Sequence, residues 1–307
     1  MTNITITGSG LALPVARDPQ LLVDIILSAS PDDAPCVDVD PIAWLGKRKG
    51  LRYKDRATQL AYCAASDALK SAGLLIEDGL TVDACDIAVV GTSNFGNLDT
   101  VTSTIDILSA EDTTSTSPMD LPNASSNVLA SSVAVRYGLK GPNLMLCNGA
   151  TSGTDALMVA STLLRAQRAR HVVVVGAEPD NKPIQRLISG RGANAGAAIV
   201  METSDTAIDR GARMQAQLER VTPSIGVDSW QGLSHADETV VIGGPLTTSD
   251  DSTFTVTLPR AWGDMSGMLG VLQAVLAGAL LERRPTARVL THTGDSTATV
   301  GASFVAP

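Results

Sequence analysis

Apolar runs and a helical pattern alternate between positions 141 and 178, and this stretch organises the rest of the chain. The segment 144–147 is a short apolar run bounded by turn residues, and 172–175 is a continuous β-branched run, as expected for a strand covered on both faces. Between them, apolar residues recur at helical spacing. The pattern predicts a strand–helix–strand crossover whose two strands lie parallel in one sheet.

Similar patterns predict further elements along the chain. Helices are expected at 21–27, 57–72, 122–137 and 263–281. Strands are expected at 4–7, 87–90, 197–201, 214–221, 254–258, 289–293 and 302–305. Polar or turn-rich segments should be connections, namely 112–118, 204–213 and 222–252. Strands alternating with helices indicate a layered α/β fold. A small-residue turn before a buried helix occurs at 149–164 and again at 263–281, which indicates two similar halves.

Composition describes a globular protein with an aliphatic core. The chain has 307 residues, of which 44% are hydrophobic and 3% aromatic, and its formal charge is −9. This charge argues against nucleic-acid binding, which needs clustered Lys and Arg. No apolar run approaches the roughly 20 residues of a membrane span, and the first residues lack the basic region of a signal peptide. A cytoplasmic location is therefore expected.

The four cysteines are widely spaced and form no CxxC pair. Reduced, mostly buried thiols are therefore expected rather than disulfides. Neither a metal site nor a cofactor site is expected. The four residues are Cys36, Cys63, Cys85 and Cys147.

The turn at 149–153 reads Gly-Ala-Thr-Ser-Gly and opens the central helix. Free N–H groups and the helix dipole favour negative charge at such a place, and an enzyme would hold its nucleophile there. The apex residue here is Ala150, which offers no chemistry. A hydrolase elbow would need serine where Thr151 stands, and no phosphate-loop pattern follows. Helix capping is therefore the expected role of Thr151 and Ser152.

Beyond this turn, the sequence resembles β-ketoacyl synthases of the thiolase superfamily over nearly its whole length. The matching segments, in order, are ITITGSGLALP, DRATQLAYCAASDALKSAGL, VVGTSNFG, LPNASSNVLASSVAVRYGLKGP, the central crossover, GANAGAAIVME, DRGARMQAQL and GDMSGMLGVLQAVLAGALL. The resemblance implies one αβαβα sandwich of two pseudo-equivalent halves, 1–202 and a shortened 203–307. It also implies dimerisation through the strand 143–147.

In this family, a cysteine at a helix N-terminus is acylated and two histidines assist malonyl decarboxylation. Carried over by position, the cysteine falls on Ala150, one histidine on Asp264 and the other near Gly244. The glycine-rich C-terminal loop falls on 295–299, which contains no glycine. The catalytic machinery is therefore missing, and the shortening is expected mainly between 218 and 258.

Residual chemistry and the subunit interface give further candidate residues. His292 with Asp264 is the candidate for a remodelled acid–base pair, whereas Asp264 alone is an ordinary N-terminal acid of a helix. His171 is expected to be structural and His235 exposed in a loop. On family analogy, the tunnel or interface candidates are Asn94, Phe95, Asn123, Asn143, Met145, Cys147 and Thr151.

The resemblance implies a chain-length factor, the ketosynthase β-subunit of type II polyketide synthases. Such a subunit forms a heterodimer with an active ketosynthase α-subunit and shapes the tunnel in which an aromatic or polyene product grows. Acyl carrier protein should dock mainly on the partner, because this chain is acidic. Two alternatives stay open: a thiolase-fold enzyme that performs non-covalent acyl transfer or cyclisation, and a homodimeric scaffold that binds carrier protein or fatty acyl groups.

Overall fold

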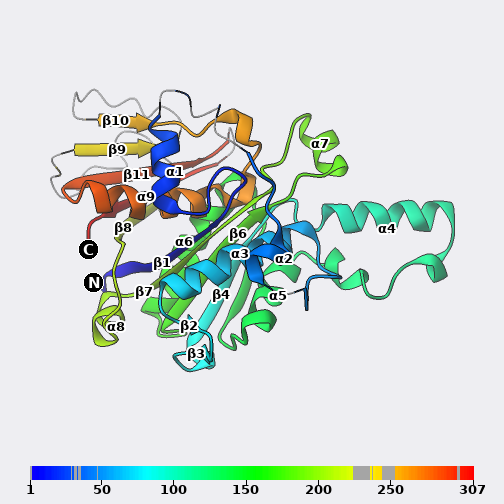
Figure 1. Cartoon of the computed structure of the whole chain (residues 1–307), viewed down its shortest axis with the longest axis horizontal. Coiled ribbons are helices and arrows are strands. Elements are labelled where there is room, and N and C mark those ends of the chain that lie inside the picture. Colours follow the sequence, from blue (N-terminus) through cyan, green and yellow to red (C-terminus); the bar gives the residue numbers. More distant parts are fainter. Residues whose placement is uncertain are drawn as a thin grey trace.

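A mixed sheet forms the body of the protein, as the computed structural model in Figure 1 shows. The structure describes residues 2–28, 30, 33, 36–46, 48–223, 236, 238–243, 253–295 and 298–307. Within them, ten strands make the sheet: β1 (Ile4–Ala12), β4 (Ile87–Thr92), β5 (Asn143–Leu146), β6 (His171–Glu178), β7 (Ala195–Thr203), β8 (Ala216–Pro223), β9 (Glu238–Ile242), β10 (Thr253–Val256), β11 (Ala287–Gly294) and β12 (Thr299–Val305). A separate small hairpin pairs β2 (Leu75–Ile76) with β3 (Gly79–Leu80).

The α-helices described differ widely in length and burial. They are α1 (Pro19–Ile26), α2 (Pro41–Leu45), α3 (Arg56–Ser71), α4 (Leu98–Ala110), α5 (Val128–Tyr137), α6 (Ser152–Arg165), α7 (Lys182–Ile188), α8 (Ser204–Asp209) and α9 (Leu269–Arg283). Single 3₁₀ turns precede the two central helices: η5 (Gly149–Thr151) before α6 and η8 (Ser266–Met268) before α9. None of the described helices has both the length and the apolar character needed to cross a membrane.

The strand order shows that the two halves repeat one plan. Along the sheet it is β10-β9-β11-β12-β8-β1-β7-β6-β4-β5. Each half therefore places its third, second, fourth, fifth and first strands side by side, and β1 pairs with β8 where the halves meet. The second, third and fourth strands run parallel and the fifth antiparallel in both halves. The predicted repeat of two halves is confirmed, while its boundary after residue 202 stays a prediction.

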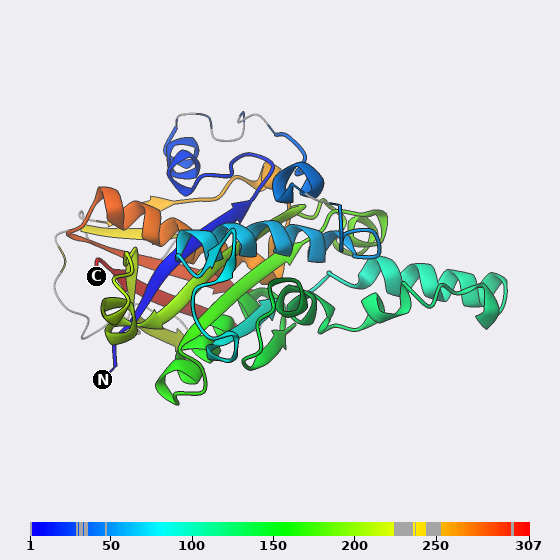
Figure 2. The same ribbon diagram turned by 60° about the horizontal axis from the view of Figure 1, so that its bottom comes forward.

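The core is layered around two helices, α6 and α9. Each of them follows the third strand of its own half. α6 and α9 pack against each other and against strands of both halves. On the opposite face of the first half, α3 and α5 cover the β-branched strands (Figure 2). Among the described residues after 215, α9 is the only α-helix, so the second half is the shorter one. The predicted thiolase-like sandwich with a buried central helix is therefore confirmed.

Glycine allows the two central helices to approach closely. A Cβ on Gly153 of α6 would lie 2.7 Å from Gly270 N and 2.8 Å from Gly267 O. The first atom lies at the beginning of α9 and the second in η8, and backbone atoms cannot move as a flexible side chain can. The small residues of the two sequence patterns are thus explained by this contact.

Several expected boundaries change in the structure. The helix predicted at 122–137 begins only at Val128, because Leu121–Ala124 form a separate 3₁₀ turn and the backbone of Ser125 is extended. The segment expected to be a polar connection, 204–213, contains α8, and 222–252 contains β9. The helix α4 was not predicted. Only Cys63 is buried, whereas Cys36, Cys85 and Cys147 are exposed, so the expectation of mostly buried thiols is wrong.

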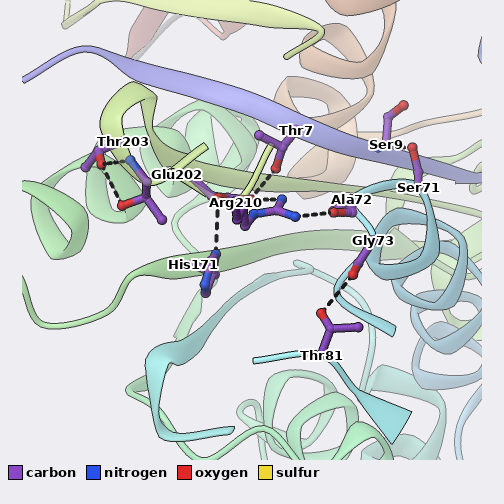
Figure 3. A network of polar contacts seen from close by, with 11 residues as sticks. Thr7, Ser9, Ser71, Ala72, Gly73, Thr81, His171, Glu202, Thr203 and Arg210 are labelled. Atoms are coloured by element: carbon purple, nitrogen blue, oxygen red, sulfur yellow. Dashed lines mark hydrogen bonds and ion pairs between the residues drawn. The ribbon is translucent and has the colours of Figure 1, made fainter. Parts of the chain in front are cut away.

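A buried ionic network joins β1, β6, β7 and the turn after α8 (Figure 3). Glu202 is fully buried; it accepts a 2.6 Å hydrogen bond from Thr7 Oγ1, and its Oε2 lies 3.3 Å from His171 Nδ1. Arg210 donates two hydrogen bonds to the same carboxylate and a third to the carbonyl of Ala72. Burial alone would raise the pKa of Glu202, but the neighbouring His171 and the hydrogen bonds from Arg210 and Thr7 outweigh it and lower that pKa to about 2. His171 is therefore structural, as expected.

Candidate functional site

The turn between β5 and α6 is held by its own backbone and hydroxyl groups. Gly149 has φ +86°, a conformation that favours glycine, and Ala150 follows it, half-buried, just before α6. The Ser152 hydroxyl accepts from Asn148 N at 2.9 Å and donates to Gly149 O at 2.8 Å. Thr151 Oγ1 donates to Asp155 Oδ2 at 2.8 Å. Neither hydroxyl accepts a hydrogen bond from an N–H of the helix, so the expected capping role is wrong: the two groups bond within the turn and to Asp155. The half-buried methyl group of Ala150, which precedes them, cannot react.

Asn94, just after β4, links this turn to the corresponding turn of the second half. Its Nδ2 donates to Gly149 O at 2.8 Å and to Ser266 Oγ at 2.6 Å. Its Oδ1 accepts from Gly149 N and from Ser152 Oγ, each at 3.2 Å. One side chain thus fixes η5 relative to η8. The place of Asn94 at a tunnel or subunit interface stays a prediction.

Behind Asn94 lies a buried acid that the sequence interpretation did not single out. Glu178 ends β6 with no exposed surface. Its carboxylate accepts four hydrogen bonds of 2.7 to 3.1 Å. One comes from Ser93 Oγ, and the other three come from the backbone N–H groups of Asn94, Phe95 and Gly267. Burial raises the pKa of Glu178 to about 7, although these hydrogen bonds favour the ionised form. Glu178 therefore fixes residues 93–95 relative to the 3₁₀ turn that contains Gly267.

The raised pKa of Glu178 predicts a specific pH dependence of stability. The pKa of the folded state lies above the usual 4.5, so the folded protein holds this proton more tightly than the unfolded chain does. The contribution is fully present below about pH 4.5 and is lost as the pH rises towards about 7. We expect Glu178→Gln, which cannot titrate, to lack this decline.

The measurement is the free energy of unfolding in urea between pH 4.5 and 8 for both proteins. As the pH rises over that interval, the free energy of unfolding of wild type should fall relative to that of Glu178→Gln. A constant offset between the two proteins does not affect this trend. Parallel curves would show that Glu178 does not titrate in this range.

The candidate acid–base pair consists of His292 and Asp264, and only Asp264 occupies a position that corresponds to one of the family's histidines. Asp264 Oδ1 accepts from Ser266 N at 2.8 Å, and the backbone of Asp264 pairs with that of 191–193. Thr293 contacts Thr154 of α6 at 2.8 Å, so His292, the preceding residue of β11, faces the opposite side of the sheet. Burial lowers the pKa of His292. No described hydrogen bond joins His292 to Asp264, and Gly244 and His235 lie outside the described residues.

The interface candidates divide into scaffold residues and residues beside a hollow. Asn123 is buried and donates to Tyr53 O at 2.7 Å, and Asn143 donates to Ala130 O at 3.0 Å. Phe95 contributes its backbone N–H to Glu178. A hollow of about 100 Å³ opens beside β5, and its lining includes Asn94, Met145 and Cys147. Sequence reasoning missed Asp55 and Asn97, which line the same hollow.

The thiol nearest to the turn is a poor nucleophile. Cys147 is exposed just after β5, yet partial burial of its sulfur and the nearby Glu178 raise the pKa of this thiol. A smaller thiolate fraction means lower reactivity. Among the described residues, no cluster of three or more His, Cys, Asp or Glu side chains could hold a metal ion.

Comparison with known proteins gives a consistent family relationship. Residues 36–196 match the family described as "Beta-ketoacyl synthase, N-terminal domain". The 3-oxoacyl-[acyl-carrier-protein] synthase 2 of Coxiella burnetii is 26% identical over 198 residues, which cover 59% of this chain and 47% of that protein. The granaticin polyketide putative beta-ketoacyl synthase 1 of Streptomyces violaceoruber is 26% identical over 203 residues, covering 59% and 48%. The matched region spans about half the length of these relatives.

Solved structures share the fold across the whole chain. A complex described as a type II PKS acyl-carrier protein with its ketosynthase bound to the hexaketide includes a chain with a TM-score of 0.83 and 16% identity, covering 100% of this chain and 99% of that one. The ishigamide ketosynthase/chain length factor gives a TM-score of 0.76 and 19% identity, covering 99% and 100%. These similarities extend to the second half, which the family match does not reach.

Proposed function

Because this chain belongs to the β-ketoacyl synthase family, we propose that it is a non-catalytic chain-length factor. In this role it pairs with an active ketosynthase and shapes the tunnel in which a polyketide is elongated by a type II synthase. The product is aromatic or polyene. Bond formation takes place on the cysteine of the partner, and this chain limits the space available to the growing product.

A single observation carries the proposal: the site keeps its scaffold but has a methyl group where the nucleophile would be. Asn94 and Glu178 together make eight hydrogen bonds that hold η5, η8 and residues 93–95 in place, and Ala150 lies at the apex of the first of these turns. Covalent acyl transfer needs a nucleophile, which in this family is a cysteine, because the acyl-enzyme intermediate splits the reaction into two steps. Retention of the turn without the thiol supports a structural role.

The free edge of the sheet supports the proposed partner. β5 is the last strand of the order, and its residues Asn143 and Leu144 are exposed. An edge strand with unpaired backbone groups is a template for pairing with another chain. Because Met145 and Cys147 line the hollow beside this strand, a subunit paired here shares the hollow with this chain. Acyl carrier protein docks mainly on the partner, since a net charge of −9 repels its acidic surface.

Co-expression with cysteine-bearing ketosynthases from the same genome tests the proposal. We expect a 1:1 heterodimer, measured by light scattering after size exclusion. We also expect no acyl adduct on this chain in intact-mass spectra after incubation with acyl and malonyl thioesters. The Ala150→Cys variant is the matched control, because its thiol at a helix N-terminus should be labelled by iodoacetamide at the apex.

Three results would contradict the proposal. An acyl adduct on the unmodified chain alone would show a nucleophile elsewhere. Activity of the isolated chain that Asp264→Ala or His292→Ala abolishes would support the remodelled enzyme. A stable, monodisperse homodimer that ignores every ketosynthase would support the scaffold for carrier protein or fatty acyl groups.

A further inference from the structure

Three exposed arginines gather at the end of α6. Arg165 lies in the last turn of the helix, and Arg168 and Arg170 follow it. No described residue forms an ion pair or a side-chain hydrogen bond with these guanidinium groups, whereas eight other arginines of the described part are ion-paired. A cation in the last turn suits the helix dipole, which explains only Arg165. Cations so close together repel one another, and an anion between them would relieve that repulsion.

Hydrogen bonds of the backbone fix the turn that carries these side chains. Arg168 N donates to Leu163 O and Arg170 N donates to Asp86 O, each at 2.9 Å. Between them, Gln167 has φ +52°, a left-handed conformation that is uncommon for a residue with a β-carbon. Because the backbone is already ordered, a ligand that binds here only has to order side chains, which lowers the entropic cost of binding.

A hollow of about 440 Å³ lies beside this turn, and its volume is in the range of small-molecule sites. Arg165, Gln167 and Arg170 line it from the turn, whereas Arg168 does not contribute to the lining. The hollow therefore receives two cations and an amide from a fixed segment of backbone. A concave site of this kind suits a small anion better than a flat surface would.

Hydroxyl groups and one acid from the end of β7 and from α8 complete the lining. Thr203 Oγ1 lies 2.8 Å from Thr206 Oγ1 and also accepts from Thr206 N at 3.1 Å (Figure 3). The contact between the two hydroxyl groups uses one of their protons, so the other can donate to a ligand. Asp205 is exposed in the first turn of α8, and its carboxylate can only accept hydrogen bonds.

This combination selects a ligand with two different polar parts. Two guanidinium groups suit a phosphate, because their hydrogen bonds to it are charge-assisted. Asp205 repels a second phosphate but accepts hydrogen bonds from hydroxyl groups. None of the described lining residues is aromatic, so a nucleotide base finds no ring on which to stack.

We propose that this hollow binds a sugar phosphate: the phosphate lies between Arg165 and Arg170, and the sugar hydroxyl groups meet Asp205 and the threonine pair. Nucleic acid and anionic membranes fit poorly, because the chain as a whole carries a charge of −9. α6 has 14 residues and is therefore about 20 Å long, with Arg165 at the end far from the turn at Ala150. The inference is therefore independent of the proposed function.

Calorimetric titration of the full chain with ribose 5-phosphate, in a buffer without phosphate, tests this proposal. We expect saturable binding of one molecule per chain. Arg165→Ala/Arg170→Ala should weaken binding about tenfold or more, because it removes both charged donors. Arg168→Ala is the matched control: Arg168 belongs to the same cluster but does not line the hollow, so its loss should change the Kd less than about threefold.

Asp205→Asn separates recognition of the sugar from attraction of an anion. The variant should bind ribose 5-phosphate at least about threefold more weakly, because a charged acceptor of the sugar hydroxyl groups is lost. Inorganic phosphate should bind the variant as tightly as wild type or more tightly, because a repelling charge is removed.

Three outcomes would overturn the proposal. The first is the absence of saturable binding of ribose 5-phosphate, or binding that persists unchanged in Arg165→Ala/Arg170→Ala. The second is equal affinity for inorganic phosphate and ribose 5-phosphate with no effect of Asp205→Asn, which would leave an adventitious ion only. The third is binding of nucleic acid or of phosphatidylglycerol vesicles through the same arginines in place of the sugar phosphate. Circular dichroism and thermal unfolding without ligand check that the variants remain folded, as expected for exposed positions.

Discussion

Gly153→Ala is expected to destabilise the protein by about 3 kcal/mol or more, although alanine is the better helix former. The added methyl carbon would lie within 2.8 Å of two backbone atoms of the second half, Gly270 N and Gly267 O. Relief requires α6 and α9 to move apart. Both helices pack against strands of both halves, so such a movement disturbs the whole central layer.

Gly278→Ala is the matched control, because Gly278 also lies in a central helix. A Cβ there would meet only the side chain of Gln215 at 3.5 Å, which is an ordinary van der Waals distance. This variant should be neutral or more stable by up to about 1 kcal/mol, as expected when a helical glycine becomes alanine. Urea unfolding of both variants provides the measurement. Equal effects of the two substitutions would show that close approach of the central helices does not limit stability.

Glu202→Ala is expected to cost about 3–5 kcal/mol at pH 7, the usual penalty for breaking a buried ion pair by removing one partner. Arg210 and His171 would lose the carboxylate that they share under the sheet. The pKa of about 2 in the folded protein lies below the usual 4.5, so the stabilisation is present above about pH 4.5. It is lost as the pH falls towards about 2.

Glu282→Ala is the control for this substitution, because its partner Arg213 is 74% exposed and surface pairs contribute little. Unfolding in urea at pH 7 and at pH 3 should show a large difference between wild type and Glu202→Ala at pH 7 and a smaller one at pH 3. A difference that stays constant with pH would mean that the lost stability comes from packing rather than from the charge of Glu202.

The sequence was most informative where burial is complete. The crossover around the central turn is correct because β6 is covered on both faces and α6 has a buried side, so their patterns are strong. In α4, by contrast, Thr and Ile dominate, and β-branched residues disfavour a helix when no core requires one. Strand β9 has five residues and is defined by parallel pairing with β10 and β11, which local patterns do not reveal.

The site could be predicted only in part, for a related reason. The sequence alone shows that the nucleophile is missing, because a single position of the turn, occupied here by Ala150, would carry it. The role of Glu178 depends on donors that come from residues 93–95 and from Gly267, which are distant in sequence. One feature of the sequence could have indicated this role: Glu178 ends an otherwise apolar strand, and a carboxylate in such a place is rarely buried without hydrogen-bond partners.

The open end of the sheet at β5 has a consequence for biogenesis. If β5 pairs with another chain as proposed, a copy made before that partner carries an exposed strand edge, with Leu144 40% exposed on a strand that pairs with β4 on its other side. Exposed strand edges of this type pair with strands of other molecules and lead to aggregation. Under the proposed pairing, balanced synthesis of the two subunits would therefore leave less of this edge exposed than a surplus of this chain would.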